Sequence, residues 1–116
     1  GFSYEAMERY LEKNKKPPKA LFISSDATAA GILKSIREHG FLVPGDCNIV
    51  TYNNTTFSES STPPLDSIEV YLKESAKEAT FALERFWNAE KLPRKIVIPC
   101  SLVIRGSIKK QENNDR

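Results

Sequence analysis

The sequence predicts an α/β fold built on an open, mostly parallel sheet flanked by helices. Two observations lead to this fold class. Helical and strand-like patterns alternate along residues 2–88, and such alternation is typical of βαβ units with parallel strands. The strand-like segments include short continuous apolar runs, as expected for strands that are covered on both faces. Ligands bind such sheets beyond the carboxyl ends of the strands, so a site is expected there.

The first predicted helix covers residues 2–14, and Pro17 ends it. Its apolar residues follow the helical period and are Phe2, Ala6, Met7, Tyr10 and Leu11. Residues 20–24 then form a short apolar strand. Asp26 is a favourable N-cap for a second helix, which Gly40 stops. One stripe of this second helix is expected to face the sheet and consists of Ala29, Leu33 and Ile36.

The remaining elements are predicted from the same patterns. In chain order they are a turn-rich connection at 41–46, a strand at 48–52, a long polar loop at 53–64, a strand at 66–70, a helix at 72–88 and two β-rich segments at 96–98 and 102–104. The long loop is the feature of most interest, because loops of this length are uncommon in compact domains and often carry function. Residues 109–116 form a charged tail that is expected to fray.

Composition limits the possible classes of function. A chain of 116 residues with 40% hydrophobic and 28% charged residues has room for one small globular domain. Its net charge of +2 is too small, and its basic residues are too scattered, to predict a nucleic-acid surface on this segment. Cys47 and Cys100 are too few for a disulfide scaffold and are compatible with a reducing cytoplasm. No apolar run approaches the ~20 residues of a membrane span. The chain opens on Gly1 without an initiator Met, and an upstream segment is therefore expected.

No catalytic constellation is recognisable, and we expect a protein that is not an enzyme. Acyl transfer needs a nucleophile with a base, and the single His39 lies at the predicted end of a helix, where a structural role is expected. There is no cysteine pair with zinc spacing, no GxGxxG and no Walker loop, so neither a metal nor another cofactor is expected. Asp26 could serve as a general base, a helix cap or a ligand contact, and these alternatives remain open.

Two polar clusters follow the predicted strands. Residues 24–26 (Ser-Ser-Asp) come directly after the first strand, and residues 53–55 (Asn-Asn-Thr) follow the second. Their hydroxyl, amide and carboxylate groups suit a ligand with many hydroxyls, because each sugar hydroxyl both donates and accepts hydrogen bonds. Asn53 and Asn54 have a second interpretation, as turn formers that tolerate a left-handed backbone.

A set of short segments keeps its order and approximate spacing across residues 1–108. The segments are ALFISSD leading into AAG at 20–31, GFLVPGD at 40–46, IVTYNNT at 49–55, PPLDSI at 63–68 and IPCSLVIRGS at 98–107. Together they resemble LacI/GalR-type transcriptional regulators, and the Asn-Asn pair after Tyr52 looks most like the maltose-type repressors of that family. The chain departs from the pattern where Ser25 stands in place of the usual Asn and Asn53 in place of the usual Asp.

The resemblance implies a periplasmic-binding-protein-like fold of type I, with two α/β subdomains and an effector in the cleft between them. On this basis residues 1–70 belong to the C-terminal subdomain, residues 71–108 form a crossover helix and strands that return to the N-terminal subdomain, and residues 109–116 form the tail. The chain is therefore expected to be a partial domain. The effector contacts that the resemblance carries over are Ser25, Asp26 and Asn53. The absence of a carboxylate at Asn53 leaves the identity of the effector open.

The function implied by the resemblance is that of a cytoplasmic transcriptional repressor of carbohydrate utilisation. Its effector is expected to be a neutral sugar, an α-glucoside such as maltose. The resemblance also implies a homodimer that reads operator DNA through a helix-turn-helix upstream of Gly1. A solute-binding protein of a sugar transporter shares the fold and is the alternative. An enzyme acting on a carbohydrate is a third possibility, and it would need a second carboxylate paired with Asp26.

The helix after Asp26 carries a second stripe that is a candidate dimer interface. The stripe consists of Ala27, Ala30 and Lys34, at positions i, i+3 and i+7. Small residues allow another backbone to approach closely, and a lysine stem can pack while its charge stays at the rim. The resemblance implies that residues 59–62 join the same interface. The alternative is that these alanines are ordinary helix formers on an exposed face.

Overall fold

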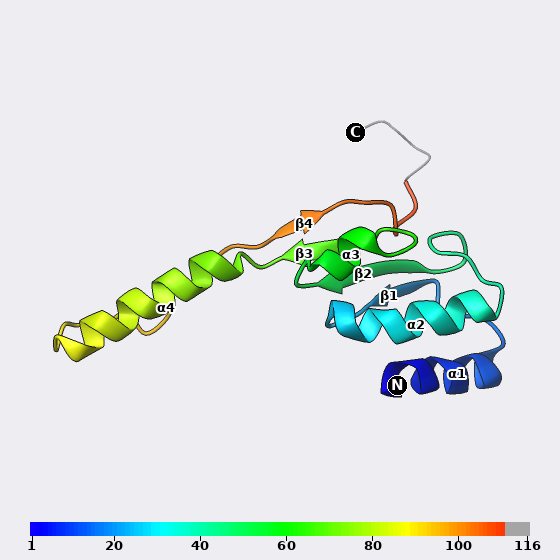
Figure 1. Ribbon diagram of the computed structural model, residues 1–116, viewed down its shortest axis with the longest axis horizontal. Coiled ribbons are helices and arrows are strands. Elements are labelled where there is room, and N and C mark those ends of the chain that lie inside the picture. The colour runs from blue at the N-terminus through cyan, green and yellow to red at the C-terminus, as the bar shows by residue number, and fades with distance from the viewer. Residues whose placement is uncertain (111–116) are drawn as a thin grey trace. The chain divides into compact units, whose positions relative to one another are not determined.

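The computed structural model describes residues 1–110 (Figure 1). The elements alternate as the sequence predicts, and in chain order they are α1 (Phe2–Asn14), β1 (Ala20–Phe22), α2 (Asp26–Glu38), β2 (Asn48–Tyr52), α3 (Thr56–Ser60), β3 (Asp66–Glu69), α4 (Leu72–Trp87) and β4 (Ser101–Val103). The helix α3 was not expected, because residues 53–64 were predicted to be a polar loop. Residues 111–116, most of the predicted charged tail, lie outside the described residues.

The strands form one sheet in the order β1-β2-β3-β4. β1 and β3 both pair parallel with β2, with Leu21 opposite Ile49 and Thr51 opposite Ser67. β4 runs antiparallel to β3. Asp66, at the start of β3, bonds to Arg105 beyond the end of β4, whereas Tyr71, beyond the end of β3, bonds to Ser101 at the start of β4. The predicted mostly parallel sheet is therefore confirmed, with one antiparallel strand at its edge.

The chain divides into two compact units. Unit 1 consists of Gly1–Glu69 together with the described residues from Leu102 onward, and unit 2 consists of Val70–Ser101. No helix among the described residues is long and apolar enough to cross a membrane.

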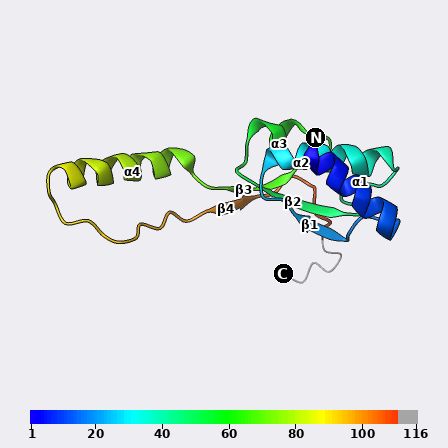
Figure 2. The ribbon, with the colours of Figure 1, turned by 90° about the horizontal axis from the view of Figure 1, so that it is seen from below.

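The core of unit 1 lies between its helices and one face of its sheet. Figure 2 shows α1, α2 and α3 on the same side of strands β1 to β3. The buried apolar residues come from both layers and are Met7, Leu11, Ile23, Ala29, Leu33, Ile36, Cys47, Ile49 and Leu65. The predicted stripe of α2 is thus confirmed as the face that packs on the sheet. Gly31 allows the close packing of α2 on α1, because a Cβ there would clash with the backbone nitrogen of Tyr4.

The opposite face of the sheet is only partly covered within the described part of the chain. Successive side chains of a strand point to opposite faces, and the β1 side chains on this second face are exposed, with Phe22 at 62%. The ring of Phe22 packs edge-on against Tyr52 of β2, with 6.5 Å between the ring centroids. The prediction that β1 is covered on both faces is therefore wrong for this chain. Its apolar run shows that burial is favoured there, but the described helices reach only one face.

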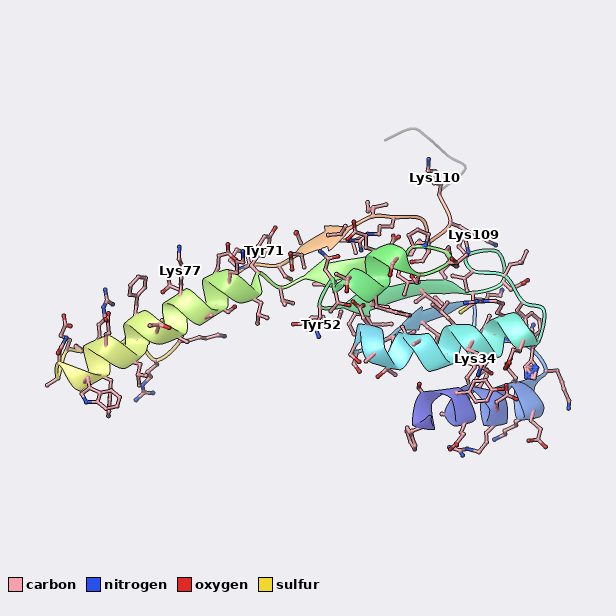
Figure 3. The ribbon with its side chains drawn as sticks, in the orientation of Figure 1. Lys34, Tyr52, Tyr71, Lys77, Lys109 and Lys110 are labelled. Carbon is pink, nitrogen blue, oxygen red and sulfur yellow. The ribbon has the colours of Figure 1, made fainter. Side chains whose placement is uncertain are left out.

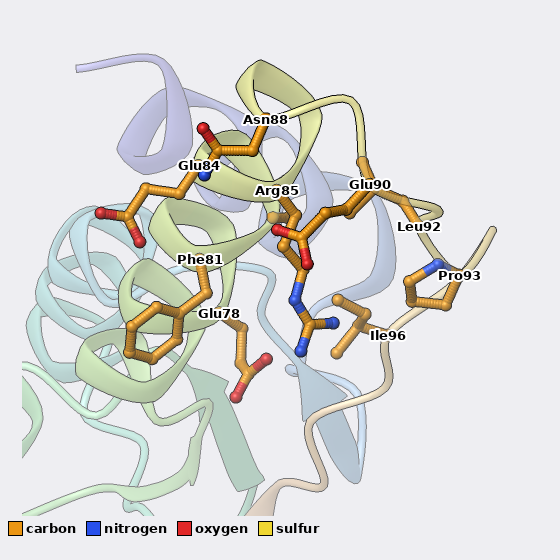
Figure 4. Close-up of a pocket in the computed structure, with 10 residues that line it drawn as sticks. Glu78, Phe81, Glu84, Arg85, Asn88, Glu90, Leu92, Pro93 and Ile96 are labelled. Atoms are coloured by element: carbon orange, nitrogen blue, oxygen red, sulfur yellow. The ribbon is translucent and has the colours of Figure 1, made fainter.

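Unit 2 contains α4 followed by an extended segment. The predicted strand at 96–98 is wrong, because these residues form no strand in the structure. A groove in unit 2 is lined by Phe81 and Arg85 of α4 and by Leu92 and Ile96 of the extended segment (Figure 4). None of the residues of α4 is buried.

Candidate functional site

The two polar clusters predicted from the sequence lie at one edge of the sheet. Ser25 and Asp26 follow β1, and residues 53–55 follow β2. Because β1 and β2 are parallel neighbours, their carboxyl ends meet at the same edge. A direct contact joins the clusters, since the backbone N–H of Thr55 donates to the carboxylate of Asp26 at 2.7 Å.

Ser25 is the N-cap of α2. Its backbone is extended, and its side-chain oxygen accepts a hydrogen bond from the backbone N–H of Thr28 at 3.2 Å. This is the geometry by which a serine satisfies a donor left free at a helix start. The prediction that Asp26 caps the helix is therefore wrong: the cap is one residue earlier, and Asp26 is the first residue of the helix. Ser25 is half-buried, and its hydroxyl also forms a hydrogen bond with the hydroxyl of Thr28 at 2.9 Å.

The Asp26 carboxylate points into the protein and is only 2% exposed as a residue. It accepts hydrogen bonds from Thr55, through the backbone N–H at 2.7 Å and the hydroxyl at 2.5 Å, and from the hydroxyl of Ser67 at 3.5 Å. Burial by itself raises the pKa of this carboxyl, but the hydrogen bonds, those from Thr55 above all, outweigh it and hold the pKa below the ordinary value of 3.8. Asp26 is thus ionised near neutral pH and joins the helix start to the loop after β2.

The loop that contains Asn53 has an unusual backbone. Asn53 and Asn54 both have positive φ angles, of 98° and 48°, a region that asparagine tolerates better than most residues. Three consecutive backbone N–H groups are fixed by different partners. The N–H of Asn53 donates to the carbonyl of Ile68, that of Asn54 to the hydroxyl of Ser67, and that of Thr55 to Asp26.

This geometry bears on the two interpretations of the asparagines. Their left-handed backbone confirms that they form a turn, and the side chain of Asn53 is also exposed at the edge, where a ligand can reach it. Turn formation and ligand contact are therefore compatible at Asn53. Sequence reasoning missed the part played by Thr55 and Ser67, which hold the edge together from within the protein.

The candidate dimer stripe of α2 lies on the surface of unit 1. Ala27, Ala30 and Lys34 are all exposed. The Lys34 ammonium lies 5.2 Å from the centre of the Tyr4 ring of α1 (Figure 3), a distance at which a cation is attracted to an aromatic face. The Tyr4 hydroxyl donates to Glu38 at 2.6 Å, and this bond is the main reason that the pKa of Tyr4 is raised to about 12. Beside the stripe, an apolar groove is formed by side chains that include Leu33, Phe41, Leu42 and Pro63.

The described residues contain no group of three or more His, Cys, Asp and Glu side chains that could hold a metal ion. His39 lies at the C-cap of α2 and pairs with Glu8 of α1 at 3.1 Å. This pair joins two helices away from the polar edge, which agrees with the structural role expected for His39. Burial raises the pKa of the Cys47 thiol to about 11, so this cysteine is a poor nucleophile.

Comparison with known proteins identifies the family to which the chain belongs. Residues 2–108 match the model of the periplasmic binding protein-like domain. The chain belongs to this family, in the form found in LacI/GalR regulators. Its relatives include the repressor MelR of Bacillus subtilis, 33% identical over 104 residues, and the regulator GalR of Streptococcus thermophilus, 33% identical over 107 residues. These matches cover 90% and 91% of this chain but 30% and 32% of the relatives, so this LacI/GalR-type chain spans about a third of their length.

Solved structures of this family agree in fold. A complex of the transcriptional regulator CelR with cellobiose superposes with a TM-score of 0.79 at 26% identity, over 90% of this chain and 32% of that one. The lac repressor dimer bound to operator and an anti-inducer gives a TM-score of 0.85 at 24% identity, over 91% of this chain and 37% of that one. The predicted family and the periplasmic-binding-protein-like fold class, as a partial domain, are thereby confirmed.

Proposed function

We propose that this chain forms part of the effector-binding domain of a transcriptional repressor that controls carbohydrate utilisation. The observation that carries the proposal is the bond between Thr55 and Asp26, which joins two polar segments at the ligand-binding edge of a parallel sheet. The relatives are transcriptional regulators, and catalysis is not part of the proposal. In the full-length repressor, a helix-turn-helix outside this chain reads operator DNA in the bacterial cytoplasm.

The proposed effector is a neutral sugar, held in a cleft of which this edge forms one wall. Asn53 offers an amide at the surface, and the half-buried Ser25 offers a hydroxyl that also bonds to Thr28. The carboxylate of Asp26 is bonded to Thr55, so Asp26 contributes its negative charge without a direct contact. A hydroxyl and an amide suit sugar hydroxyls, because each can donate or accept. The CelR complex contains the disaccharide cellobiose, which supports a disaccharide here, and we propose an α-glucoside such as maltose. Effector binding then changes DNA affinity by favouring one arrangement of the two DNA-reading heads.

Replacing Asn53 with alanine tests the effector site. Loss of one polar partner in a closed site is expected to cost about 1–3 kcal/mol of binding free energy, roughly a 5- to 150-fold weaker affinity. Isothermal titration of the full-length protein with maltose, cellobiose and other neutral sugars measures this change. Asn14→Ala, at the far end of α1, serves as the control and should bind as the wild type does. Equal affinities of Asn53→Ala and wild type for every sugar that binds would remove Asn53 from the site.

We also propose that the stripe of Ala27, Ala30 and Lys34 lies in a homodimer interface. Two half-sites in an operator call for a symmetric dimer, and the exposed small residues lie beside an apolar groove on the same unit. Ala30→Asp would bury an unpaired carboxylate in such an interface and should dissociate the dimer. On an exposed face it would change the free energy of unfolding by no more than ~0.5 kcal/mol.

Sedimentation velocity of the full-length protein distinguishes these outcomes for Ala30. Ala30→Ser adds only a small neutral hydroxyl and should leave the dimer intact, which controls for any effect of substitution as such. A dimer that persists unchanged in Ala30→Asp would show that the alanines lie on an exposed face, as the alternative interpretation holds.

A further inference from the structure

The guanidinium of Arg105 connects three parts of unit 1. One terminal nitrogen donates to the side-chain oxygen of Asn54 at 2.6 Å. The other donates to the carbonyl of Leu65 at 3.0 Å and to the hydroxyl of Ser58 at 3.3 Å. The short bond is the one to Asn54, which is next to the proposed effector contact Asn53.

The backbone of Arg105 is itself held in place by a buried carboxylate. Asp66, which is 2% exposed, accepts hydrogen bonds at one oxygen from the consecutive backbone N–H groups of Arg105, Gly106 and Ser107, at 2.9, 2.8 and 3.1 Å. The backbone N–H of Asp66 donates in turn to the hydroxyl of Ser107 at 2.7 Å. A carboxylate surrounded by several N–H donors is well stabilised. The start of the Arg105 side chain therefore has a fixed position.

The guanidinium end of that side chain contacts the loop with the unusual backbone. Asn53 and Asn54 have positive φ angles, and such residues persist only where their surroundings determine the backbone. The backbone N–H groups of the loop are held by β3 and α2. The bond from Arg105 holds the side chain of Asn54.

We infer that Arg105 is a positioning residue for the effector loop: through Asn54 it holds the turn that presents Asn53 to the ligand. The inference rests on the proposed effector site. Lysine could not replace it, because a lysine ammonium is a single point charge, whereas the two terminal nitrogens of the guanidinium reach Asn54 on one side and Leu65 on the other. Arg105 holds the loop through Asn54 and does not contact the ligand itself.

The first measurement needs no ligand. Hydrogen–deuterium exchange of the full-length protein should be faster in Arg105→Lys than in wild type at the amides of residues 53–55, with the amides of α2 and β2 unchanged. Arg9→Lys, the same change at an exposed position on α1, is the control and should leave exchange at 53–55 as it is. Unchanged exchange at 53–55 in Arg105→Lys would overturn the inference. Faster exchange throughout unit 1 would overturn it too, because Arg105 would then stabilise the fold as a whole.

The second measurement is sugar affinity. Arg105→Lys and Asn54→Ala should each weaken sugar binding by ~10-fold. The double variant should bind no more weakly than the single variant with the lower affinity, because both changes remove the same contact. Losses that multiply in the double variant would overturn the inference. Absence of sugar binding by wild type would overturn the proposed function instead, and the exchange measurement would still decide whether Arg105 holds the loop.

Discussion

Helices α2 and α4 have similar sequence patterns and very different surroundings. Each has apolar residues at helical spacing along one face. Five residues of α2 are buried, Ala29, Leu33 and Ile36 of its apolar stripe among them. None of the sixteen residues of α4 is buried, and Phe86 and Trp87 near its end are 70% and 77% exposed.

The difference shows what an amphipathic pattern does and does not specify. The period of the pattern indicates which side of a helix gains from burial, and it contains no information about what covers that side. α2 lies on a sheet and beside α1 within unit 1. Unit 2 has one helix and an extended segment, so the apolar side of α4 calls for a partner outside this unit. The second subdomain that the family resemblance implies for the full-length protein would supply it.

The largest expected effect is at Leu33 of α2, and it tests the comparison directly. Leu33 is 3% exposed, so Leu33→Ala should lower the free energy of unfolding by about 2–5 kcal/mol through lost burial and a residual cavity. The same change at Leu83 of α4, which is 54% exposed, should cost far less, within ~0.5 kcal/mol. Urea denaturation of both variants, at a protein concentration low enough to keep the chain monomeric, measures the difference. Similar costs at the two positions would contradict the comparison and would indicate that α4 is packed in solution.

A smaller effect is expected from the charge of Asp26, which fixes the start of α2. Because hydrogen bonds hold the pKa of Asp26 below its ordinary value in the folded chain, the unfolded chain takes up a proton first as the pH falls. The stabilisation is therefore present above the unfolded pKa of about 4 and is lost as the pH falls through the folded pKa. Asp26→Asn should remove this part of the pH dependence.

Urea midpoints at pH 6 and pH 3 measure this dependence. Near neutral pH, Asp26→Asn should cost about 1–3 kcal/mol, because the donors from Thr55 lose a charged acceptor. Glu5→Gln removes a carboxyl that lies exposed on α1, and this control should keep the acid dependence of wild type. If Asp26→Asn and wild type lose stability equally between the two pH values, the carboxylate is not the group that anchors the helix start.

The smallest effect on stability, and a distinct effect on association, is expected on α4. The exposed apolar side of this helix should drive association of chain 1–116 with a second copy of itself. Leu83→Lys should leave the free energy of unfolding of the monomer within ~0.5 kcal/mol of wild type and reduce association in sedimentation experiments at higher concentration. Lys77→Ala, off the apolar stripe, should associate as wild type does. A monomeric wild-type chain would contradict this prediction.

The sequence by itself determined most of the local structure. It gave the bounds of α1 and β2, the buried stripe of α2, the helix at α4 and the two polar segments beyond β1 and β2. These features depend on side-chain periodicity and on residues close together in the chain, so a single pass along the sequence can find them. The shared edge of the polar segments also followed, since neighbouring parallel strands end on the same side.

Only the tertiary structure decided which groups satisfy one another. Asp26 bonds to Thr55, 29 residues away, and Arg105 bonds to Asn54, 51 residues away. The sequence could not identify these pairs, because a carboxylate or a guanidinium has many possible partners and burial selects among them only after the chain has folded. The same holds for the exposed face of β1 and the missing strand at 96–98. An apolar segment favours burial or pairing, but the neighbours that would provide it are set by the packing of the whole chain.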